Sequence, residues 1–349
     1  MDQTVGRRWL ARITTLVLGV TISSFLMLDG GGRRTLGAVG EEPGASAGAA
    51  AAAGLRDLPS AAVSDPPHLP RPVATLAGPS ETDRLHDDLA MLAKQSGARV
   101  SIALRELSGR TRASWSLNGG QVFTAASTYK LPVLMLEAQR IGSGQVSAAG
   151  RICFEDEDWE DGYFGDYEAG DCYTRSQLAW RVAHFSDNTA AHILVRDIGG
   201  SAALNRFARA HGAAASAFYD PNTTTADDLA ALWLDEDLGR AGGTAAQRWL
   251  YPILTGTAYE SGIPAGVPGD GMVAHKIGDY GGTVNDAALI MGPSTRYVLV
   301  VCTDGLDSAR GNSLIARISA RVWEYESGRA VQAAFRPAAR AAPRVRTGF

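Results

Sequence analysis

The chain has 349 residues, 45% of them hydrophobic, so it is long enough to build one large domain or two small ones around a core. Its formal net charge of −4 is small, and neither a basic stripe nor a nucleic-acid-binding motif is present, so DNA or RNA is not expected as a partner. The carboxylates do not follow the helix–loop–helix spacing of a calcium site. We therefore expect no metal. We also expect that the protein is a monomer and has no cofactor.

The N-terminal segment, residues 1–29, is predicted to be a signal peptide or an uncleaved membrane anchor. Its apolar stretch at 13–28 is long for the core of a signal peptide and short for a membrane-spanning helix. Three arginines precede that stretch: Arg7, Arg8 and Arg12. No cysteine lies directly after it, which excludes a lipid-anchored form. Both remaining interpretations place most of the chain outside the cytoplasm, either secreted or membrane-anchored.

Residues 30–79 are rich in Ala, Gly and Pro and are predicted to be a disordered linker. Regular structure is expected from Ser80 onward. Leucines at helical spacing predict a helix over 82–95, ended by Gly97. Residues 100–107 and 111–117 have the pattern of two strands in a hairpin.

The stretch Ser127-Thr128-Tyr129-Lys130 places a hydroxyl and an amine three residues apart. If a helix starts at Ser127, the two side chains lie on one face, about 5–6 Å apart at Cβ. Pro132 is tolerated there, because the N–H groups of a first helical turn have no partner within the helix. A lysine with a lowered pKa can accept the proton of the serine hydroxyl. The pattern therefore predicts a serine nucleophile with its base, on a helix that ends near Gly142.

The choice of basic residues supports this interpretation. Only three of the 33 Lys and Arg residues are lysines, namely Lys94, Lys130 and Lys276. Arginine cannot lose its proton in a protein, whereas lysine can. A lysine kept where arginine is the rule suggests a need for a compact or titratable amine.

Residues 154–171 are acidic and aromatic. Two interpretations stay open: a solvated loop, which is the usual fate of a charge run, or a lid over the site with an aromatic edge for substrate. Cys153 and Cys172 flank this region and could form a disulfide, or all three cysteines could be unpaired, because pairing cannot be derived from sequence. Cys302 lies in an apolar run and is predicted to be a buried free thiol.

A block of helices is expected next. Thr174 and Gln177 form a capping-box pattern that opens a helix to Phe185, and an apolar helix follows Asn188. Further helices are expected over 202–210, from Thr225 and from Thr244. The period then changes to strands at 272–277, 283–291 and 296–303, before a helix over 313–325.

The order of these elements predicts an α+β fold. Two strands, the helical block, three strands and a helix indicate one five-stranded antiparallel sheet built from both chain ends, with the helical block packed against it. Beyond Ser327, five arginines occur without an acid, so residues 328–349 are predicted to be a disordered tail. Residues 80–327 would then form a single catalytic domain.

Three motifs now carry a family resemblance. Ser127-Thr128-Tyr129-Lys130, Ser186-Asp187-Asn188 and His275-Lys276-Ile277-Gly278 resemble the Ser-x-x-Lys, Ser-Asp-Asn and Lys-Thr-Gly motifs of class A β-lactamases and penicillin-binding proteins. Their order and spacing agree with that family, and the likeness covers about residues 82–325. Three motifs in the right order are far more specific than any one of them.

The resemblance implies a role for each motif residue. Ser127 would form an acyl-enzyme, with Lys130 as a candidate base for that step. Ser186 would pass a proton to the leaving nitrogen, helped by Lys276, which also attracts a substrate carboxylate.

The resemblance further implies a substrate-binding edge. Asn188 would bind a side-chain amide of the substrate, beside Gly278 and Asp279. The backbone N–H groups of Ser127 and Asp279 would form the oxyanion hole, where losing one donor typically costs about 10²–10³ in rate.

The sequence also departs from the family. The stretch 212–222 is short and lacks the glutamate that activates water in class A enzymes; Asp220 is its only carboxylate and would be the stand-in. Ile277 replaces a hydroxyl residue that donates to a substrate carboxylate, and an apolar side chain cannot replace that hydrogen bond.

Three hypotheses for the function follow. The first is a class A β-lactamase-like serine hydrolase that hydrolyses small-molecule β-lactams. The second is a penicillin-binding-type peptidase or acyltransferase that acts on cell-wall peptides and releases β-lactams slowly. The third is a non-catalytic envelope module that keeps the fold.

Overall fold

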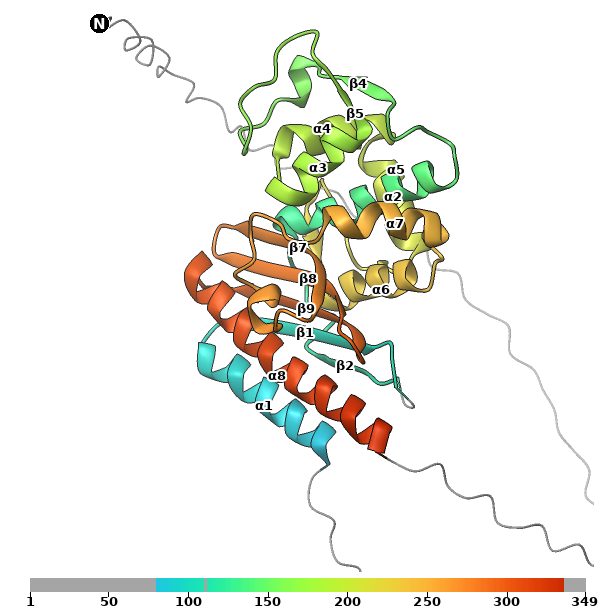
Figure 1. Ribbon diagram of the computed structural model, residues 1–349. Helices are drawn as coiled ribbons and strands as arrows, with labels where there is room; N and C mark the ends of the chain where they lie inside the picture. Colours follow the sequence, from blue (N-terminus) through green and yellow to red (C-terminus); the bar gives the residue numbers. More distant parts are fainter. Residues whose placement is uncertain (1–79, 110–111, 336–349) are drawn as a thin grey trace, which may run out of the picture. The chain divides into compact units, whose positions relative to one another are not determined.

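The computed structural model describes residues 80–109 and 112–335 (Figure 1). The expected signal or anchor segment, the expected linker and residues 336–349 of the expected tail lie outside the described residues. In the part that is described, no helix is both long and apolar enough to pass through a membrane.

Helices and strands occupy most of the described residues. The helices are α1 (Glu81–Ser96), α2 (Lys130–Gly142), α3 (Arg175–Phe185), α4 (Asn188–Asp197), α5 (Gly200–Ala210), α6 (Ala226–Asp237), α7 (Gly243–Ile253) and α8 (Ser308–Phe335). The strands are β1 (Arg99–Glu106), β2 (Ser114–Leu117), β3 (Phe123–Thr124), β4 (Arg151–Cys153), β5 (Cys172–Thr174), β6 (Thr223–Thr224), β7 (Met272–Tyr280), β8 (Thr283–Met291) and β9 (Arg296–Asp304). Three short 3₁₀ turns are η1 (Ala126–Tyr129), η2 (Asp156–Asp158) and η3 (Ile263–Gly266).

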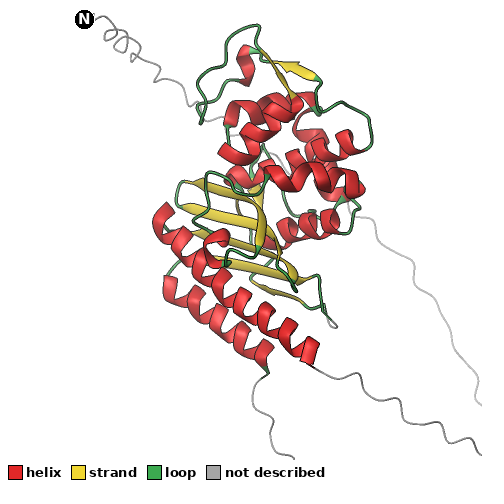
Figure 2. Cartoon of the chain, viewed as in Figure 1, coloured by secondary structure: helices red, strands yellow, loops and turns green. Residues whose placement is uncertain are grey.

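Five strands, labelled in Figure 1 and yellow in Figure 2, form one antiparallel sheet in the order β2-β1-β9-β8-β7. Strand β1 from the N-terminal side pairs directly with β9 from the C-terminal side, from Arg99 opposite Asp304 to Glu106 opposite Tyr297. The expected α+β fold, with a single antiparallel sheet built from both chain ends, is confirmed. Strand β7 lies at one edge of the sheet.

Two hydrophobic cores lie on the two faces of the sheet. On one face, α1 and α8 supply Leu85, Leu89, Ile315 and Ile318, all with no exposed surface. On the other face, the helical block from α2 to α7 packs around residues such as Leu134. Because both faces are covered, β8 and β9 are buried along nearly their whole length. β9 is continuously apolar over 297–302 instead of alternating, whereas β8 also buries two polar side chains, Asn285 and Asp286.

The last helix is longer than the sequence predicted. A helix over 313–325 and a disordered tail from 328 were expected, but α8 runs from Ser308 to Phe335. Arg329 lies 2.8 Å from the Glu106 carboxylate on β1 and 3.0 Å from that of Glu326. The tail prediction was wrong over 328–335 because the acids that pair with Arg329 precede it in the chain.

Two helix starts also differ from expectation. The chain at Ser127 forms the 3₁₀ turn η1, and α2 itself begins at Lys130, after which Pro132 is accommodated within the first turn. Helix α7 begins at Gly243, with Gly242 at its N-cap in the left-handed region (φ 114°), so Thr244 is not the cap. The capping box of Thr174 and Gln177 at the start of α3 is confirmed.

Candidate active site

Two asparagine side chains hold the turn that carries Ser127. Asn222 donates from Nδ2 to the carbonyl of Ala126 at 2.9 Å, and Asn285 on β8 donates to the carbonyl of Thr124 at 2.9 Å. Ala126 has a φ of 48°, a left-handed conformation that is uncommon for a residue other than glycine. Such strain persists only where surrounding contacts hold it, and it fixes the direction in which the next residue, Ser127, presents its hydroxyl.

Lys130 is fully buried, and its amine touches three groups of the expected site. Its Nζ donates to Ser127 Oγ at 3.1 Å, to the Ser186 carbonyl at 2.6 Å and to Asn188 Oδ1 at 2.5 Å. Burial lowers the pKa of Lys130 to about 8, and the nearby negative charges of Asp187 and Glu160 limit that fall. Lys130 is therefore an amine that can exist uncharged beside a serine hydroxyl.

Lys276 reaches the same centre from the edge strand β7. Its Nζ donates to Ser186 Oγ at 2.9 Å and to the Ile277 carbonyl at 2.9 Å. Burial, followed by the charge of Lys130, lowers the pKa of Lys276 well below its ordinary value. Ser186 itself caps the end of α3 with a φ of 56°, and this turns its hydroxyl toward both amines.

Asp187 and Asn188 fix this segment in different ways. The Asp187 carboxylate caps α4 by accepting from the Ala190 N–H at 2.8 Å, and it accepts from the Tyr167 hydroxyl at 2.5 Å. Asn188 accepts from Lys130 and donates from Nδ2 to the Asp161 carbonyl at 2.7 Å. Asp187 is therefore structural, whereas Asn188 links the lysine to the acidic loop.

The edge of β7 approaches the serine closely at Gly278. A Cβ added to Gly278 would lie 2.6 Å from the Ala125 carbonyl oxygen and 3.1 Å from the Ser127 nitrogen. Only glycine permits this approach of strand to turn. Asp279 is the next residue along this edge and is exposed. The oxyanion hole expected from the N–H groups of Ser127 and Asp279 remains a prediction.

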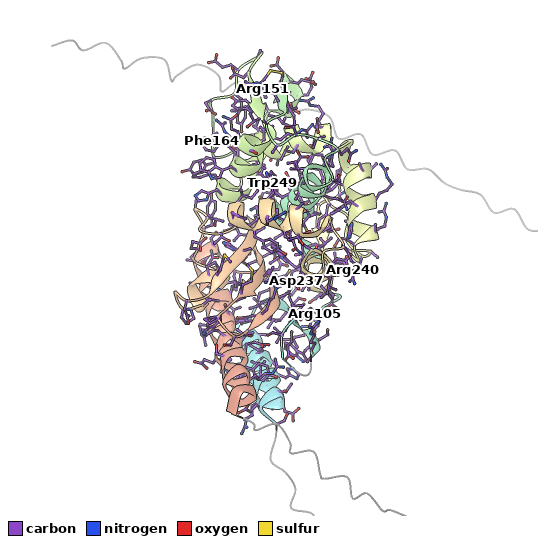
Figure 3. The ribbon with its side chains drawn as sticks, turned by 45° about the vertical axis from the view of Figure 1, so that its right-hand side comes forward. Arg105, Arg151, Phe164, Asp237, Arg240 and Trp249 are labelled. Carbon is purple, nitrogen blue, oxygen red and sulfur yellow. A yellow bond between two sulfur atoms is a disulfide. The ribbon has the colours of Figure 1, made fainter. Side chains whose placement is uncertain are left out.

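The acidic region 154–171 packs against the Ser186–Asn188 segment, so the simple picture of a solvated loop is incomplete. The Phe164 N–H donates to Asp187 at 2.9 Å, and the Phe164 ring contacts Phe185 of α3 with centroids 5.2 Å apart (Figure 3 labels Phe164 beside the helical block). A Cβ on Gly162 would lie 3.0 Å from the Asn188 nitrogen. Several of its carboxylates are nevertheless exposed, including Glu155, Asp156 and Glu157.

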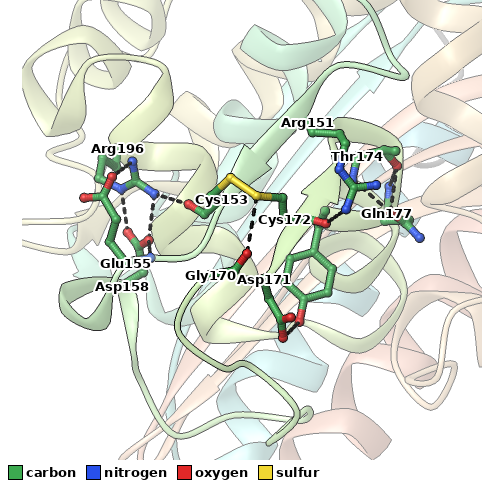
Figure 4. Close-up of a disulfide and its surroundings, with 11 residues drawn as sticks. Arg151, Cys153, Glu155, Asp158, Gly170, Asp171, Cys172, Thr174, Gln177 and Arg196 are labelled. Carbon is green, nitrogen blue, oxygen red and sulfur yellow. Dashed lines mark hydrogen bonds and ion pairs between the residues drawn. A yellow bond between two sulfur atoms is a disulfide. The ribbon is translucent and has the colours of Figure 1, made fainter.

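A disulfide closes the base of this acidic loop. Cys153 on β4 is bonded to Cys172 on the paired strand β5 (Figure 4). Arg196 of α4 holds the same region by bonding the Cys153 carbonyl at 2.7 Å, Asp158 at 2.8 Å and Glu155 at 2.7 Å. Cys302 is a buried free thiol, as the sequence predicted.

The loop that the sequence singled out for its missing glutamate supplies a different residue. Asp220 is exposed, and in the described structure no hydrogen bond joins it to Ser127 or Lys130. Asn222, two residues later, donates from Nδ2 to the carbonyl of Ala126, the residue before Ser127. The Oδ1 atom of Asn222 is buried without a partner among the described residues. Sequence reasoning missed Asn222, whose only signal was its place in an Asp-Pro-Asn turn. Within the described ranges, no group of three or more His, Cys, Asp or Glu residues is placed to hold a metal ion.

The sequence model of the Beta-lactamase enzyme family matches residues 84–325. The chain belongs to this family. The β-lactamase OXY-2 of Klebsiella oxytoca is 27% identical over 246 residues, which cover 64% of this chain and 82% of that protein. The β-lactamase Toho-2 of Escherichia coli is 26% identical over 239 residues, covering 64% of this chain and 81% of that protein. The resemblance to class A enzymes is thereby confirmed.

Solved structures of two kinds resemble this member of the family. The structure of PBP-A is matched with a TM-score of 0.66 and 25% identity over 71% of this chain and 97% of that chain. An ancestral class A β-lactamase is matched with a TM-score of 0.63 and 29% identity over 69% of this chain and 99% of that chain. One further match is a single-residue mutant of PBP-A in an acyl-enzyme complex with penicillin G.

Proposed function

We propose that this protein is an extracytoplasmic serine hydrolase that opens β-lactam rings through an acyl-enzyme on Ser127. The observation that carries the proposal is the 3.1 Å contact between Lys130 Nζ and Ser127 Oγ, made by a fully buried amine whose pKa is lowered to about 8. Near neutral pH about one such amine in ten is uncharged and able to accept a proton. An ordinary lysine would be almost entirely charged.

In the acylation step, Lys130 takes the proton of the Ser127 hydroxyl while Oγ bonds to the carbonyl carbon of the lactam. Negative charge develops on the carbonyl oxygen, where the N–H groups of Ser127 and Asp279 are proposed to stabilise it. The carbon–nitrogen bond then breaks, and Ser186 gives its proton to the leaving nitrogen. Lys276, 2.9 Å from Ser186 Oγ, returns a proton to that hydroxyl. The proton that Lys130 took from Ser127 then passes through Ser186 Oγ, 3.4 Å from Lys130 Nζ, to Lys276, and both amines regain their starting state.

A second candidate is a penicillin-binding-type peptidase that acts on cell-wall peptides. It is favoured by two departures from the family: the absence of a glutamate in the stretch 212–222, and Ile277 in place of a hydroxyl residue. The structural likeness to PBP-A is compatible with it. Both candidates share the acylation step, and they differ in how fast water releases the enzyme.

Labelled penicillin and intact-protein mass spectrometry test the proposal. The wild-type chain should form an adduct on Ser127 and release it within the time of the experiment, whereas Ser127→Ala should form none. Lys130→Arg should acylate at least about 10³-fold more slowly, because arginine cannot accept the proton. Lys94→Arg, at an exposed position on α1, is the matched control and should behave as the wild type.

Each remaining outcome has a definite meaning. A persistent adduct on the wild-type chain would support the peptidase candidate. The complete absence of an adduct would support a non-catalytic module. Normal acylation of Lys130→Arg would disprove the role of Lys130 as proton acceptor, whatever the fate of the adduct.

A further inference from the structure

A carboxylate and an imidazole form a pair beside Lys130 that the acylation step does not use. Glu160 Oε2 lies 2.6 Å from His192 Nε2. Glu160 belongs to the acidic loop and His192 to α4, so neither comes from the stretch 212–222. Neither residue belongs to a catalytic motif of the sequence.

The backbone of Glu160 is fixed against the first turn of α4. Its N–H donates to Thr189 Oγ1 at 3.1 Å, and the Thr189 hydroxyl donates to its carbonyl at 2.8 Å. The carbonyl of Asp161 accepts from Asn188 at 2.7 Å. Three hydrogen bonds therefore hold the backbone of Glu160 and Asp161 against Asn188 and Thr189, independently of the Glu160 side chain.

The helix geometry places the pair close to the lysine. Asn188 and His192 are four residues apart on α4, so they share one face and lie one turn from each other. Asn188 Oδ1 accepts from Lys130 Nζ at 2.5 Å, and the pair of Glu160 and His192 thus lies about one helical turn, ~5.4 Å, along the same face.

Electrostatics agree with this placement. After burial, the charge of Glu160 is the largest influence that raises the pKa of Tyr129 and of Tyr219, and it also acts on the pKa of Lys130. Tyr219 packs edge-on against both Tyr129 and His192, with ring centroids 5.7 and 5.2 Å apart. The stretch 212–222 thus places the ring of Tyr219, and not a carboxylate, beside the pair of Glu160 and His192.

Glu160 differs from three other acids of its loop, which are bound by arginine. Glu155 and Asp158 are bound by Arg196, and Asp166 is bound by Arg181 through both oxygens. Glu160 is held by an imidazole at one oxygen, and its side chain is 48% exposed against 19% for His192. One oxygen is thus fixed, while water can reach the carboxylate.

We infer that Glu160, oriented by His192, is the general base that activates water to hydrolyse the acyl-enzyme. This inference rests on the proposed function. Glu160 takes one proton of a water molecule while the water oxygen bonds to the acyl carbon. The bond from that carbon to Ser127 Oγ then breaks, the proton passes from Glu160 to Oγ, and a carboxylic acid leaves a free serine. His192 acts as a positioning residue, because it touches Glu160 and not the acyl group.

The test separates acylation from release by stopped-flow measurement with a chromogenic cephalosporin, together with intact-protein mass spectrometry. Glu160→Gln keeps the shape of the side chain and removes its basicity. We expect acylation within about threefold of wild type and release slower by at least about 10², so that the Ser127 adduct accumulates. Glu157→Gln, an exposed acid in the same loop, is the matched control and should leave both rates unchanged.

His192→Asn is the second variant, and it should slow release by about tenfold without changing the acylation rate. Glu160→Asp should restore part of the release rate, because it returns a carboxylate at shorter reach. Circular dichroism of each variant excludes loss of the fold as the cause.

The possible results distinguish this inference from the proposed function. Release by Glu160→Gln at the wild-type rate overturns the inference and leaves the acyl-enzyme intact. A wild-type adduct that persists also overturns it, and favours the peptidase candidate. A wild-type chain that forms no adduct overturns the proposed function and the inference together.

Discussion

Two buried amines share the hydroxyl of Ser186, with Lys276 Nζ at 2.9 Å and Lys130 Nζ at 3.4 Å. Two positive charges so close together in a desolvated site repel each other, and the pKa of Lys276 is lowered by burial and then by Lys130. The two amines therefore titrate as a coupled pair. A hydroxyl between them can pass a proton from one to the other, which suits a site where one proton is taken up and another is delivered.

Ile277 offers a test at the residue scale. Its side chain follows Lys276 on the edge strand, where a hydroxyl would supply a donor for a substrate carboxylate. Ile277→Thr should raise the acylation efficiency, kcat/KM, toward a carboxylate-bearing penicillin by about tenfold, since a hydrogen bond to a charged group contributes ~1.5–3 kcal/mol. Ile277→Val is the control of similar shape. Equal effects of the two substitutions would show that the hydroxyl is not involved.

The sequence and the structure differ most in the contacts that loops make. Ser127, Lys130, Ser186 and Lys276 were found from local motifs, and the structure brings them together. Glu160 could not be singled out, because it is one carboxylate in a run of many. Only the folded loop, anchored on Thr189 of α4, distinguishes it from its neighbours.

At the scale of elements, α8 shows how a distant partner changes a local prediction. An arginine-rich segment without acids has the composition of a tail, yet Arg329 is bound by Glu106 and Glu326. Both carboxylates are almost completely buried, at 2% and 1% side-chain exposure. Burial raises the pKa of Glu326 to about 7, even though Arg329 opposes that rise. The helix therefore continues because its arginine neutralises two acids beneath it.

Arg329→Ala should be strongly destabilising. It leaves two buried carboxylates without their guanidinium partner, and removing one member of a buried charge pair typically costs ~3–5 kcal/mol. The free energy of unfolding, measured by urea denaturation at pH 8, should fall by about that amount. The loss should be smaller at pH 5, where Glu326 is protonated. Arg317→Ala, at an exposed position of α8, should change the stability little, and equal losses at both positions would contradict the explanation.

At the scale of the whole described unit, each face of the five-stranded sheet packs against its own hydrophobic core. Its strands come from both chain ends, so the α1–α8 core and the helical block depend on the same backbone pairing. The change of period in the sequence predicted that these strands exist and form one sheet. It could not predict that β9 pairs with β1 from Arg99 opposite Asp304, because that register depends on residues about 200 positions apart.

Two buried groups in different parts of this unit make its stability depend on pH in the same direction. Burial, followed by the charge of Asp237, raises the pKa of Glu236 to about 8 from an ordinary value of 4.5. Neither carboxylate oxygen of Glu236 has a hydrogen-bond partner among the described residues. Burial alone would lower the pKa of His275, but Asp286 at 2.9 Å and Glu260 at 3.2 Å raise it to about 9 from 6.5.

Both groups hold a proton in the folded state over a range where the unfolded chain has released it. Where the folded state binds more protons than the unfolded state, the free energy of unfolding falls as the pH rises. Glu236 produces this fall between about pH 4.5 and 8, and His275 between about pH 6.5 and 9. Each contributes at most about 1.4 kcal/mol per pH unit. These two groups therefore make the free energy of unfolding decline from pH 5 toward pH 9, and Glu326 adds to the fall between about pH 4.5 and 7. The lowered pKa values of Lys130 and Lys276 act in the opposite direction at alkaline pH.

Glu236→Gln isolates the first of these contributions. The amide fills the same space and cannot ionise, so the decline between pH 5 and 6.5 should become shallower, with only the part due to Glu326 left, while the decline from His275 above pH 6.5 should remain. Urea denaturation at pH 5, 6.5, 8 and 9 measures both slopes, with Glu324→Gln at an exposed position of α8 as the control. Parallel curves for wild type and Glu236→Gln would mean that the Glu236 carboxyl ionises in the folded protein as it does in the unfolded chain. A second consequence follows from the same proton balance: above pH 8 the variant should be more stable than the wild type, because only the wild type must bury a carboxylate or retain a proton against the solvent.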